Sequence, residues 1–171
     1  MKHYQRFIEI PIGRLIVICD SEAIISIYFT NDVSMNDNND HPLLLQLEKE
    51  LGEYFMGKRT VFTLTLNPNG TAFQKEVWET LRTIPYSKTI SYAQEAIQFG
   101  NPKAVRAVAN ANGRNPISIL IPCHRVIATG GGLGGYSGGL WRKEFLLALE
   151  KKSNLPVQSP LFPIKTVPHI G

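Results

Sequence analysis

The hydrophobic pattern of the chain changes its period at "NPNG", residues 67–70. Before this point, short runs rich in Ile, Val, Tyr and Phe alternate with turns, which is typical of antiparallel strands. After it, apolar residues recur every three or four positions, which indicates helices. The chain of 171 residues is long enough to bury a core. We therefore expect an α+β protein with an N-terminal domain over 1–70, a mainly helical domain over 71–150 and a Pro-rich, extended tail over 151–171.

The N-terminal part predicts a three-stranded antiparallel meander followed by a helix. The strands are "YQRFIEI", "RLIVIC" and "AIISIYF", separated by the turns "PIG" and "DSE". Residues 30–41 offer little to bury and predict an exposed loop. A helix is expected to start at Pro42 and to end at Gly57, and "TVFTLTL", residues 60–66, predicts a further strand. The apolar face of the helix carries Leu44, Leu47, Leu51 and Phe55.

Capping patterns mark the helices predicted in the second half. "TAFQ" and "SYAQ" each place a hydroxyl residue three positions before a glutamine, which is the capping-box arrangement. The second of these helices would stop at Gly100, and Asn101 with Pro102 would start a third that ends at Gly113. Two short helices that meet at a glycine form either a helix-turn-helix or an ordinary helical hairpin. "LWRKEFLLALE" predicts a last helix, which the prolines after Glu150 cannot extend.

Charge is distributed unevenly along the chain. Residues 1–70 hold 6 Lys and Arg against 9 Asp and Glu, residues 71–150 hold 9 against 5, and residues 151–171 hold 3 against 0. The basic part coincides with the candidate helix-turn-helix and would attract a polyanion such as nucleic acid. An asymmetry of this size is equally compatible with a protein that binds no nucleic acid. The sequence shows no signal peptide and no apolar run that could span a bilayer, so we expect a cytoplasmic protein without a membrane partner.

The two cysteines, Cys19 and Cys123, lie in separate apolar stretches. Neither has a second cysteine a few residues away, as a zinc site would require, although Cys19, His3 and His41 could meet in space. We expect two free thiols, no metal and no cofactor.

The stretch "LIPCHRV" leaves three interpretations of Cys123: a packing residue, a metal ligand, or a thiol directed at a substrate. The run "ISILIP" before it predicts a short strand or extended segment. A thiol is a nucleophile only as the thiolate, so it needs a base or a positive field. His124 is adjacent, but neighbours on an extended chain point to opposite faces, so contact would need a bridging water, with Glu150 to orient the imidazole. From these residues alone, burial in the core is the better-supported interpretation.

A longer set of motifs changes this interpretation. "TAFQKEVWETLRTIP", "SY", "GNPKAVRAV", "NPISILI", "PCHRV" and "GGYSGGLWRKEFLLALE" together resemble the O6-alkylguanine-DNA alkyltransferase family, also called methylated-DNA-protein-cysteine methyltransferases. The spacing agrees without gaps from "SY" to Glu150. Residues 1–70 match only in size and in the order of elements.

The resemblance implies a ribonuclease-H-like N-terminal sheet with a helix, and a winged-helix-like C-terminal domain that contains the helix-turn-helix. It implies DNA repair by single-turnover transfer of the alkyl group from O6-alkylguanine to Cys123 after base flipping, with O4-alkylthymine as a further candidate substrate. The implied partner is double-stranded DNA, bound through its minor groove. It further implies a monomer that works in the cytoplasm at the nucleoid, or in the nucleus of a eukaryote.

The resemblance also assigns roles to residues. Cys123 would accept the alkyl group, His124 and Glu150 would activate it through a water, and Tyr92 would donate a proton to the leaving guanine. Arg106 would occupy the gap left by the flipped base. Without the resemblance, the same residue types would be capping, packing and loop residues. The other positions expected at the DNA or the base are Asn115, Arg114, Val126, Tyr136, Ser137, Ala104 and Ala107.

Some positions depart from the family pattern. Ser87 stands where glycine is expected, and Glu95 and Gln98 replace apolar residues in the first helix of the helix-turn-helix.

Three alternatives to alkyl transfer remain as the function of the chain. A non-catalytic alkylated-DNA-binding protein would lack the cysteine, a helix-turn-helix regulator would be indifferent to Cys123→Ala, and a Cys-His-Glu hydrolase would turn over.

Overall fold

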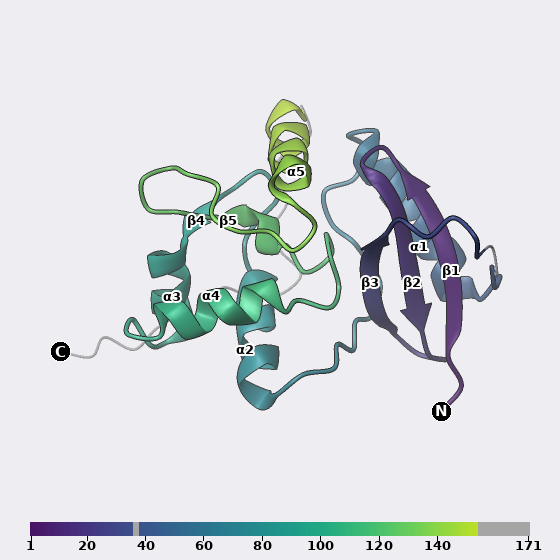
Figure 1. The fold of residues 1–171 in the computed structure, drawn as a ribbon, viewed down its shortest axis with the longest axis horizontal. Helices are drawn as coiled ribbons and strands as arrows, with labels where there is room; N and C mark the ends of the chain where they lie inside the picture. Colours follow the sequence, from purple (N-terminus) through teal and green to yellow (C-terminus); the bar gives the residue numbers. More distant parts are fainter. Residues whose placement is uncertain (36–37, 154–171) are drawn as a thin grey trace.

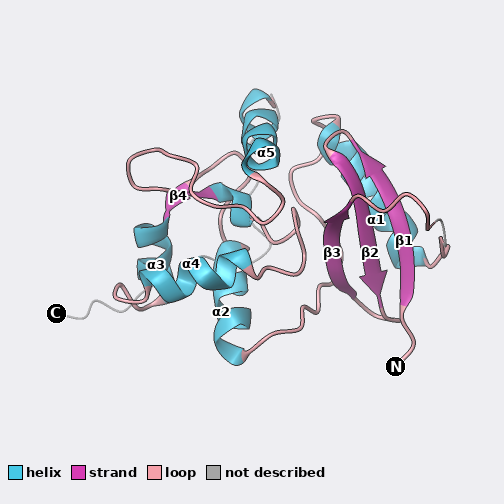
Figure 2. Ribbon diagram, viewed as in Figure 1, coloured by secondary structure: helices cyan, strands magenta, loops and turns pink. Residues whose placement is uncertain are grey.

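The computed structural model describes residues 1–35 and 38–153 (Figure 1). A three-stranded antiparallel sheet with one helix forms the N-terminal part, and a group of helices forms the C-terminal part beside it (Figure 2). This arrangement confirms the predicted α+β fold class. No helix within the described ranges is long and apolar enough to cross a membrane.

The three predicted strands are confirmed. They are β1 (Tyr4–Ile10), β2 (Gly13–Cys19) and β3 (Ile24–Thr30), which pair in the order β1-β2-β3. The helix α1 (Pro42–Phe55) lies against one face of this sheet (Figure 1). Its predicted apolar face is correct except at the end, where Tyr54 is fully buried and Phe55 only partly.

The strand predicted over 60–66 is wrong. The segment meets β3 at a single bridge, between Leu66 and Ile24. The backbone N–H of Thr63 donates instead to the carboxylate of Glu50 on α1, at 2.9 Å. Because a side chain takes the place of a neighbouring strand there, the segment forms no ladder.

Both predicted capping boxes are present. In α2 (Ala72–Leu81) the side chains and backbone N–H groups of Thr71 and Gln74 bond reciprocally, at 3.0 and 3.1 Å. The same pattern at Ser91 starts α3 (Tyr92–Phe99). Gly100, with φ of 106°, ends α3 in the left-handed conformation that glycine favours.

The third helix begins later than predicted. Asn101 caps a separate turn, because its side chain accepts from the N–H of Lys103 at 3.1 Å and its carbonyl from the N–H of Ala104 at 3.0 Å. The helix α4 (Val105–Gly113) follows without a side-chain cap. It packs on α2 and α3 around Val77, Ala96, Val108 and Ala111.

The strand or extended segment predicted over 117–122 is also wrong. Residues 118–120 form turns, and Ile119 has a φ of 73°, which is rare for a β-branched residue. The segment meets β3 at one bridge, between Ile117 and Ile27, and pairs with no strand in the described part of the chain. It leads into the 3-10 helix η1 (Cys123–Arg125) and β5 (Val126–Ile127), which pairs in parallel with β4 (Ile90–Ser91).

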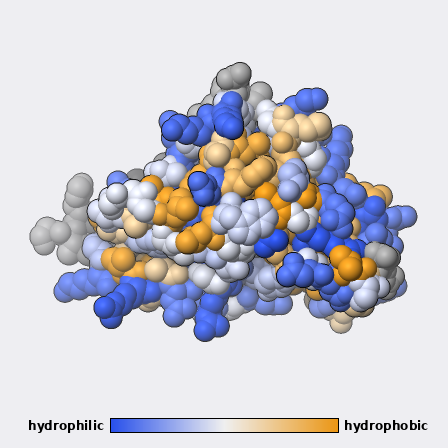
Figure 3. Space-filling model, turned by 45° about the horizontal axis from the view of Figure 1, so that its top comes forward, coloured by the Kyte–Doolittle hydropathy of each residue, from blue (hydrophilic) through white to orange (hydrophobic). Residues whose placement is uncertain are grey.

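The last predicted helix is confirmed as α5 (Leu140–Lys152), and one hydrophobic cluster joins the sheet to the helical part. Leu140 and Trp141, at the start of α5, are 49% and 57% exposed. Figure 3 turns the α5 side toward the viewer and shows apolar surface gathered in the middle of this face, with hydrophilic surface around it. Of the predicted tail, residues 154–171 lie outside the described residues.

Candidate active site

A cavity of about 320 Å³ opens beside Cys123. Its walls come from α3, the end of α4, η1 and the glycine-rich loop before α5. Gly134 in this loop has a φ of 71°, and a Cβ there would lie 2.5 Å from the hydroxyl of Tyr92, so the loop needs glycine to lie this close. The lining residues are Tyr92, Ala109, Asn112, Gly113, Cys123, Gly134, Gly135, Tyr136 and Ser137.

The thiol of Cys123 is held at the base of the site by Asn115. Asn115 Nδ2 donates to Cys123 Sγ at 3.3 Å and to the carbonyl of Ile121 at 2.8 Å, while its Oδ1 accepts from the N–H of Ile117 at 2.9 Å. Asn115 therefore fixes both the turn and the sulfur. Burial raises the pKa of the Cys123 thiol, and the Asn115 hydrogen bond and the nearby Lys143 cation oppose this shift.

Glu150 is ionised although it is 1% exposed. Its carboxylate accepts from the hydroxyl of Tyr54 at 2.7 Å, the Nε of Arg125 at 2.8 Å, the N–H of Ser87 at 3.1 Å and the Nε2 of His124 at 2.5 Å. Burial alone would raise its pKa, but His124, the Arg125 charge and the hydrogen bonds that both residues donate hold the pKa well below its usual range. The site thus contains a stable buried anion.

His124 is 0% exposed and is fixed by Glu150. Burial lowers the pKa of the imidazole, although Glu150 opposes this, so we take the ring as neutral with its proton on Nε2. Its Nδ1 is buried and has no hydrogen-bond partner among residues 1–35 and 38–153. A neutral imidazole with a vacant acceptor nitrogen can take up a proton.

Two tyrosines complete the walls. The hydroxyl of Tyr92 accepts from the N–H of Gly135 at 3.3 Å, so its own proton remains available for donation. Burial raises the pKa of Tyr92, and raises that of Tyr136 well above its usual range, so both are protonated at neutral pH. The Tyr136 hydroxyl has no partner within the described part of the chain.

The other predicted site residues lie outside this cavity. Arg106 and Ala107 are exposed on α4, and Ala104 is half-buried at its start. Arg114 is exposed and lines a neighbouring hollow together with Asn115 and Ser137. Val126 is fully buried, and its carbonyl accepts from Lys143 Nζ at 2.6 Å rather than lining the cavity.

Sequence reasoning missed Lys143 and Arg125. Lys143 is 0% exposed, and its Nζ also donates to the carbonyl of Gly135 at 3.0 Å, which ties α5 to the loop. Helical spacing could have predicted the burial of Lys143, because Lys143, Leu146 and Glu150 share one face of the last helix. Arg125 follows His124 directly in "PCHRV" and pairs with the same carboxylate.

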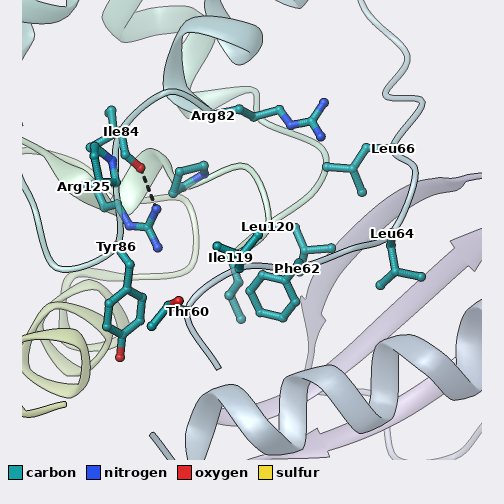
Figure 4. A pocket seen from close by; sticks show the side chains of 13 residues that line it. Thr60, Phe62, Leu64, Leu66, Arg82, Ile84, Tyr86, Ile119, Leu120 and Arg125 are labelled. Atoms are coloured by element: carbon teal, nitrogen blue, oxygen red, sulfur yellow. Dashed lines mark hydrogen bonds between the residues drawn. The ribbon is translucent and has the colours of Figure 1, made fainter. Parts of the chain in front are cut away.

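Arg125 also borders a second hollow, which Figure 4 shows from close by. Its Nη1 donates to the carbonyl of Ile84 at 2.8 Å. Phe62 approaches Ile119 and Leu120 across the hollow (Figure 4), so the segment 60–66 packs on the turn that precedes Cys123. Cys123 lines the first cavity and not this hollow, so the first cavity is the candidate site.

Two expectations about other residues have clear outcomes. Ser87 keeps the backbone geometry of the expected glycine, with a φ of 65°. Cys19 and Cys123 are both free thiols, as predicted. Cys19 Sγ lies 3.7 Å from His41 Nδ1, but no group of three metal-ligating side chains occurs in the described residues.

A helix-turn-helix beside a buried cysteine and a His-Glu pair is the arrangement of a DNA-binding protein with a candidate reactive thiol. Two family models match the chain: the ribonuclease-like domain of 6-O-methylguanine DNA methyltransferase over residues 3–68, and the DNA binding domain of the same enzyme over residues 72–152. The chain belongs to the 6-O-methylguanine DNA methyltransferase family.

Curated relatives agree with this assignment. The methylated-DNA–protein-cysteine methyltransferase of Methanosarcina acetivorans is 42% identical over 152 residues, which cover 86% of this chain and 97% of the relative. The constitutive enzyme of Bacillus subtilis is 39% identical over 160 residues, covering 88% and 97%.

Solved structures agree as well. The O6-methylguanine methyltransferase of Mycobacterium tuberculosis superposes with a TM-score of 0.81 at 39% identity, over 90% of this chain and 96% of that chain. A complex of the Mycobacterium tuberculosis protein with DNA gives 0.80 at 40% identity, over 92% and 95%. The chain is thus a methylated-DNA–protein-cysteine methyltransferase that binds DNA and repairs it by alkyl transfer.

Proposed function

We propose that Cys123 is the alkyl acceptor and that O6-alkylguanine, flipped out of double-stranded DNA, is the substrate. The observation that carries this proposal is the position of the thiol in an open cavity walled by Tyr92 and Tyr136. Cys19, the other cysteine, is 0% exposed and lies outside this cavity, so a substrate bound there cannot reach it, and burial raises its pKa to about 11.

The reaction uses protons that these residues can supply and accept. The proton of Cys123 passes through a bridging water to Nδ1 of His124, while Glu150 stabilises the resulting imidazolium. The thiolate attacks the alkyl carbon, the new C–S bond forms as the C–O6 bond breaks, and the electron pair stays with the base. Tyr92 donates its hydroxyl proton so that neutral guanine leaves. The thioether has no route back to the thiol by exchange, so each molecule acts once.

DNA is bound through α4 in the minor groove. The exposed Arg106 fills the space vacated by the flipped base, and the small side chains of Ala104 and Ala107 allow close approach. Asn115, Arg114 and Ser137 act at the base or the adjacent backbone, and Val126, whose side chain is buried, acts there through its backbone. Residues 1–70 and 71–150 form separate domains of a monomer, which works where DNA lies, in the cytoplasm at the nucleoid.

Mass spectrometry tests the proposal. The protein is incubated with a duplex that contains one O6-methylguanine, and its peptides are analysed. We expect one methyl group on the Cys123 peptide, none on the Cys19 peptide, and none in Cys123→Ala. Tight binding to the lesion without an adduct would instead identify a damage-binding protein, and repeated turnover would identify a hydrolase.

Arg106→Ala separates flipping from chemistry. Because the arginine acts on the duplex, this variant should lose at least about tenfold in rate on duplex DNA and little on free O6-alkylguanine base. Lys103→Ala, an exposed cation nearby, is the matched control. Equal losses on both substrates would remove Arg106 from the flipping step.

A further inference from the structure

The first helix of the helix-turn-helix buries a carboxyl group that the proposed reaction does not use. Glu95 lies in the first turn of α3 and is 0% exposed. Its Oε2 accepts from Asn112 Nδ2 on α4 at 2.6 Å. In the described part of the chain the carboxyl group forms no ion pair, and Lys143, whose charge acts on it, donates to two carbonyl oxygens. A buried carboxylate with one neutral donor is costly.

Two oxygen atoms of this pair are left without partners. Glu95 Oε1 and Asn112 Oδ1 are both buried and form no hydrogen bond within residues 1–35 and 38–153. Two acceptors cannot bond to each other unless one of them carries a proton. A proton on Glu95 Oε1 would make it a donor and satisfy both atoms at once.

We propose that Glu95 is a neutral acid that forms a cyclic pair with Asn112, in which Nδ2–H donates to Oε2 and Oε1–H donates to Oδ1. This pair positions Asn112 in the wall of the cavity and keeps negative charge away from Cys123. The inference deepens the proposed function and rests on it. Asn112 lines the same cavity as Cys123, which places the pair next to the reacting thiol. Burial raises the pKa of Glu95 to about 8, against the opposing effects of Asn112 and Lys143, in agreement with a bound proton at neutral pH.

The groups around Glu95 link its charge to the reactivity of the Cys123 thiol. The titratable groups that face it are Tyr92 on its own helix, Cys123 in η1 and Lys143 on α5. Apart from the Asn112 hydrogen bond, α2 and α4 pack against α3 through the apolar side chains of Val77, Ala96 and Val108. The Lys143 cation attracts both a Cys123 thiolate and an ionised Glu95. Loss of the Glu95 proton therefore adds a second anion beside the thiolate and makes the two compete for one cation.

A pH profile tests this proposal. Single-turnover rates on an O6-methylguanine duplex and rates of Cys123 carboxamidomethylation by iodoacetamide are measured from about pH 6.5 to 9.5. Glu95→Gln should pair with Asn112 as the neutral acid does, because its amide both donates and accepts. We expect its rates to equal wild type at pH 7 within about twofold and to exceed wild type about tenfold at pH 9.5, the effect of one unit of thiol pKa.

Two further variants keep the test sharp. Glu144→Gln, an exposed carboxyl on α5, is the matched control and should follow wild type at every pH. Glu95→Leu cannot ionise either, and should show the same alkaline gain if the Gln variant folds poorly. Wild-type and Glu95→Gln profiles that stay parallel, or a large loss of rate in Glu95→Gln at pH 7, would overturn the proposal. Failure of duplex transfer in every variant would count against the proposed function alone, because iodoacetamide reports on Cys123 without DNA.

Discussion

Glu150 and Glu95 are two carboxyl groups near Cys123 that are buried to the same depth, at 1% and 0% exposed. Glu150 accepts hydrogen bonds from four described groups, and two of these belong to His124 and Arg125. Glu95 accepts one, from a neutral amide. The first is held as an anion and the second as an acid, so the donors around a buried carboxyl, rather than its depth, determine its charge. Near the same sulfur, the site therefore contains an anion, Glu150, that orients His124, and a neutral pair, Glu95 with Asn112.

The largest expected effect is that of Glu150→Gln. Removing this anion leaves Arg125 buried without its charge partner, which should cost about 3 to 5 kcal/mol in the free energy of unfolding and abolish rapid alkyl transfer. Glu95→Gln is the matched control, because it makes the same chemical change and should not lower the free energy of unfolding at pH 7, where wild type must bind a proton at Glu95 on folding. Urea denaturation measures both. Similar losses in the two variants would end the distinction between the two carboxyls.

The stabilisation contributed by Glu150 and that contributed by Glu95 change with pH in opposite directions. The folded-state pKa of Glu150 lies below its ordinary value of 4.5, so its stabilisation is complete above that pH and is lost as the pH falls below it. The folded-state pKa of Glu95 is raised from 4.5 to about 8, so its stabilisation is complete below about pH 4.5 and is lost as the pH rises toward 8. Wild type should therefore lose stability relative to Glu150→Gln in acid, and relative to Glu95→Gln between pH 5 and 8.

A smaller effect is expected for Tyr54→Phe. This change removes the donor that α1 of the N-terminal part supplies to Glu150, and should cost about 1.5 kcal/mol because the bond is made to a charged group. Tyr28→Phe, at a tyrosine that is 46% exposed, should cost little. Urea denaturation of both variants checks this expectation. An unchanged stability in Tyr54→Phe would show that the remaining donors suffice to hold the anion.

The smallest effect concerns Ser87, whose N–H is another donor to Glu150. With a φ of 65° this serine occupies a conformation that costs a residue with a Cβ about 1 kcal/mol. Ser87→Gly should therefore raise the free energy of unfolding, by somewhat less than about 1 kcal/mol because glycine gains freedom in the unfolded chain. Thermal unfolding at pH 7 provides the measurement. A decrease in stability would mean that the serine side chain contributes more than its backbone strain costs.

Features that depend on neighbouring residues in the sequence could be predicted. The helix starts at Thr71 and Ser91 follow from capping boxes that span four residues each. The association of Cys123, His124 and Glu150 was implied by the family resemblance, and in the structure His124 is hydrogen-bonded directly to Glu150.

Features that depend on distant partners could not be predicted. The apolar runs 60–66 and 117–122 have the composition of strands, but each meets a neighbouring strand at only one bridge, and a ladder requires a partner along its length. Glu95 stood out as a departure from the family pattern. Its partner Asn112 lies 17 positions away on the next helix, and no local spacing rule connects the two.

Carbon-13 NMR of the side-chain carboxyl groups, titrated from pH 4 to 9.5 with Glu95→Gln and Glu150→Gln for assignment, tests the contrast between the two carboxyls most directly. We expect the Glu95 resonance to be that of a protonated acid at pH 6 and to titrate near pH 8, while Glu150 remains ionised throughout the range. Two carboxyl groups that are both ionised at pH 6 would contradict this account.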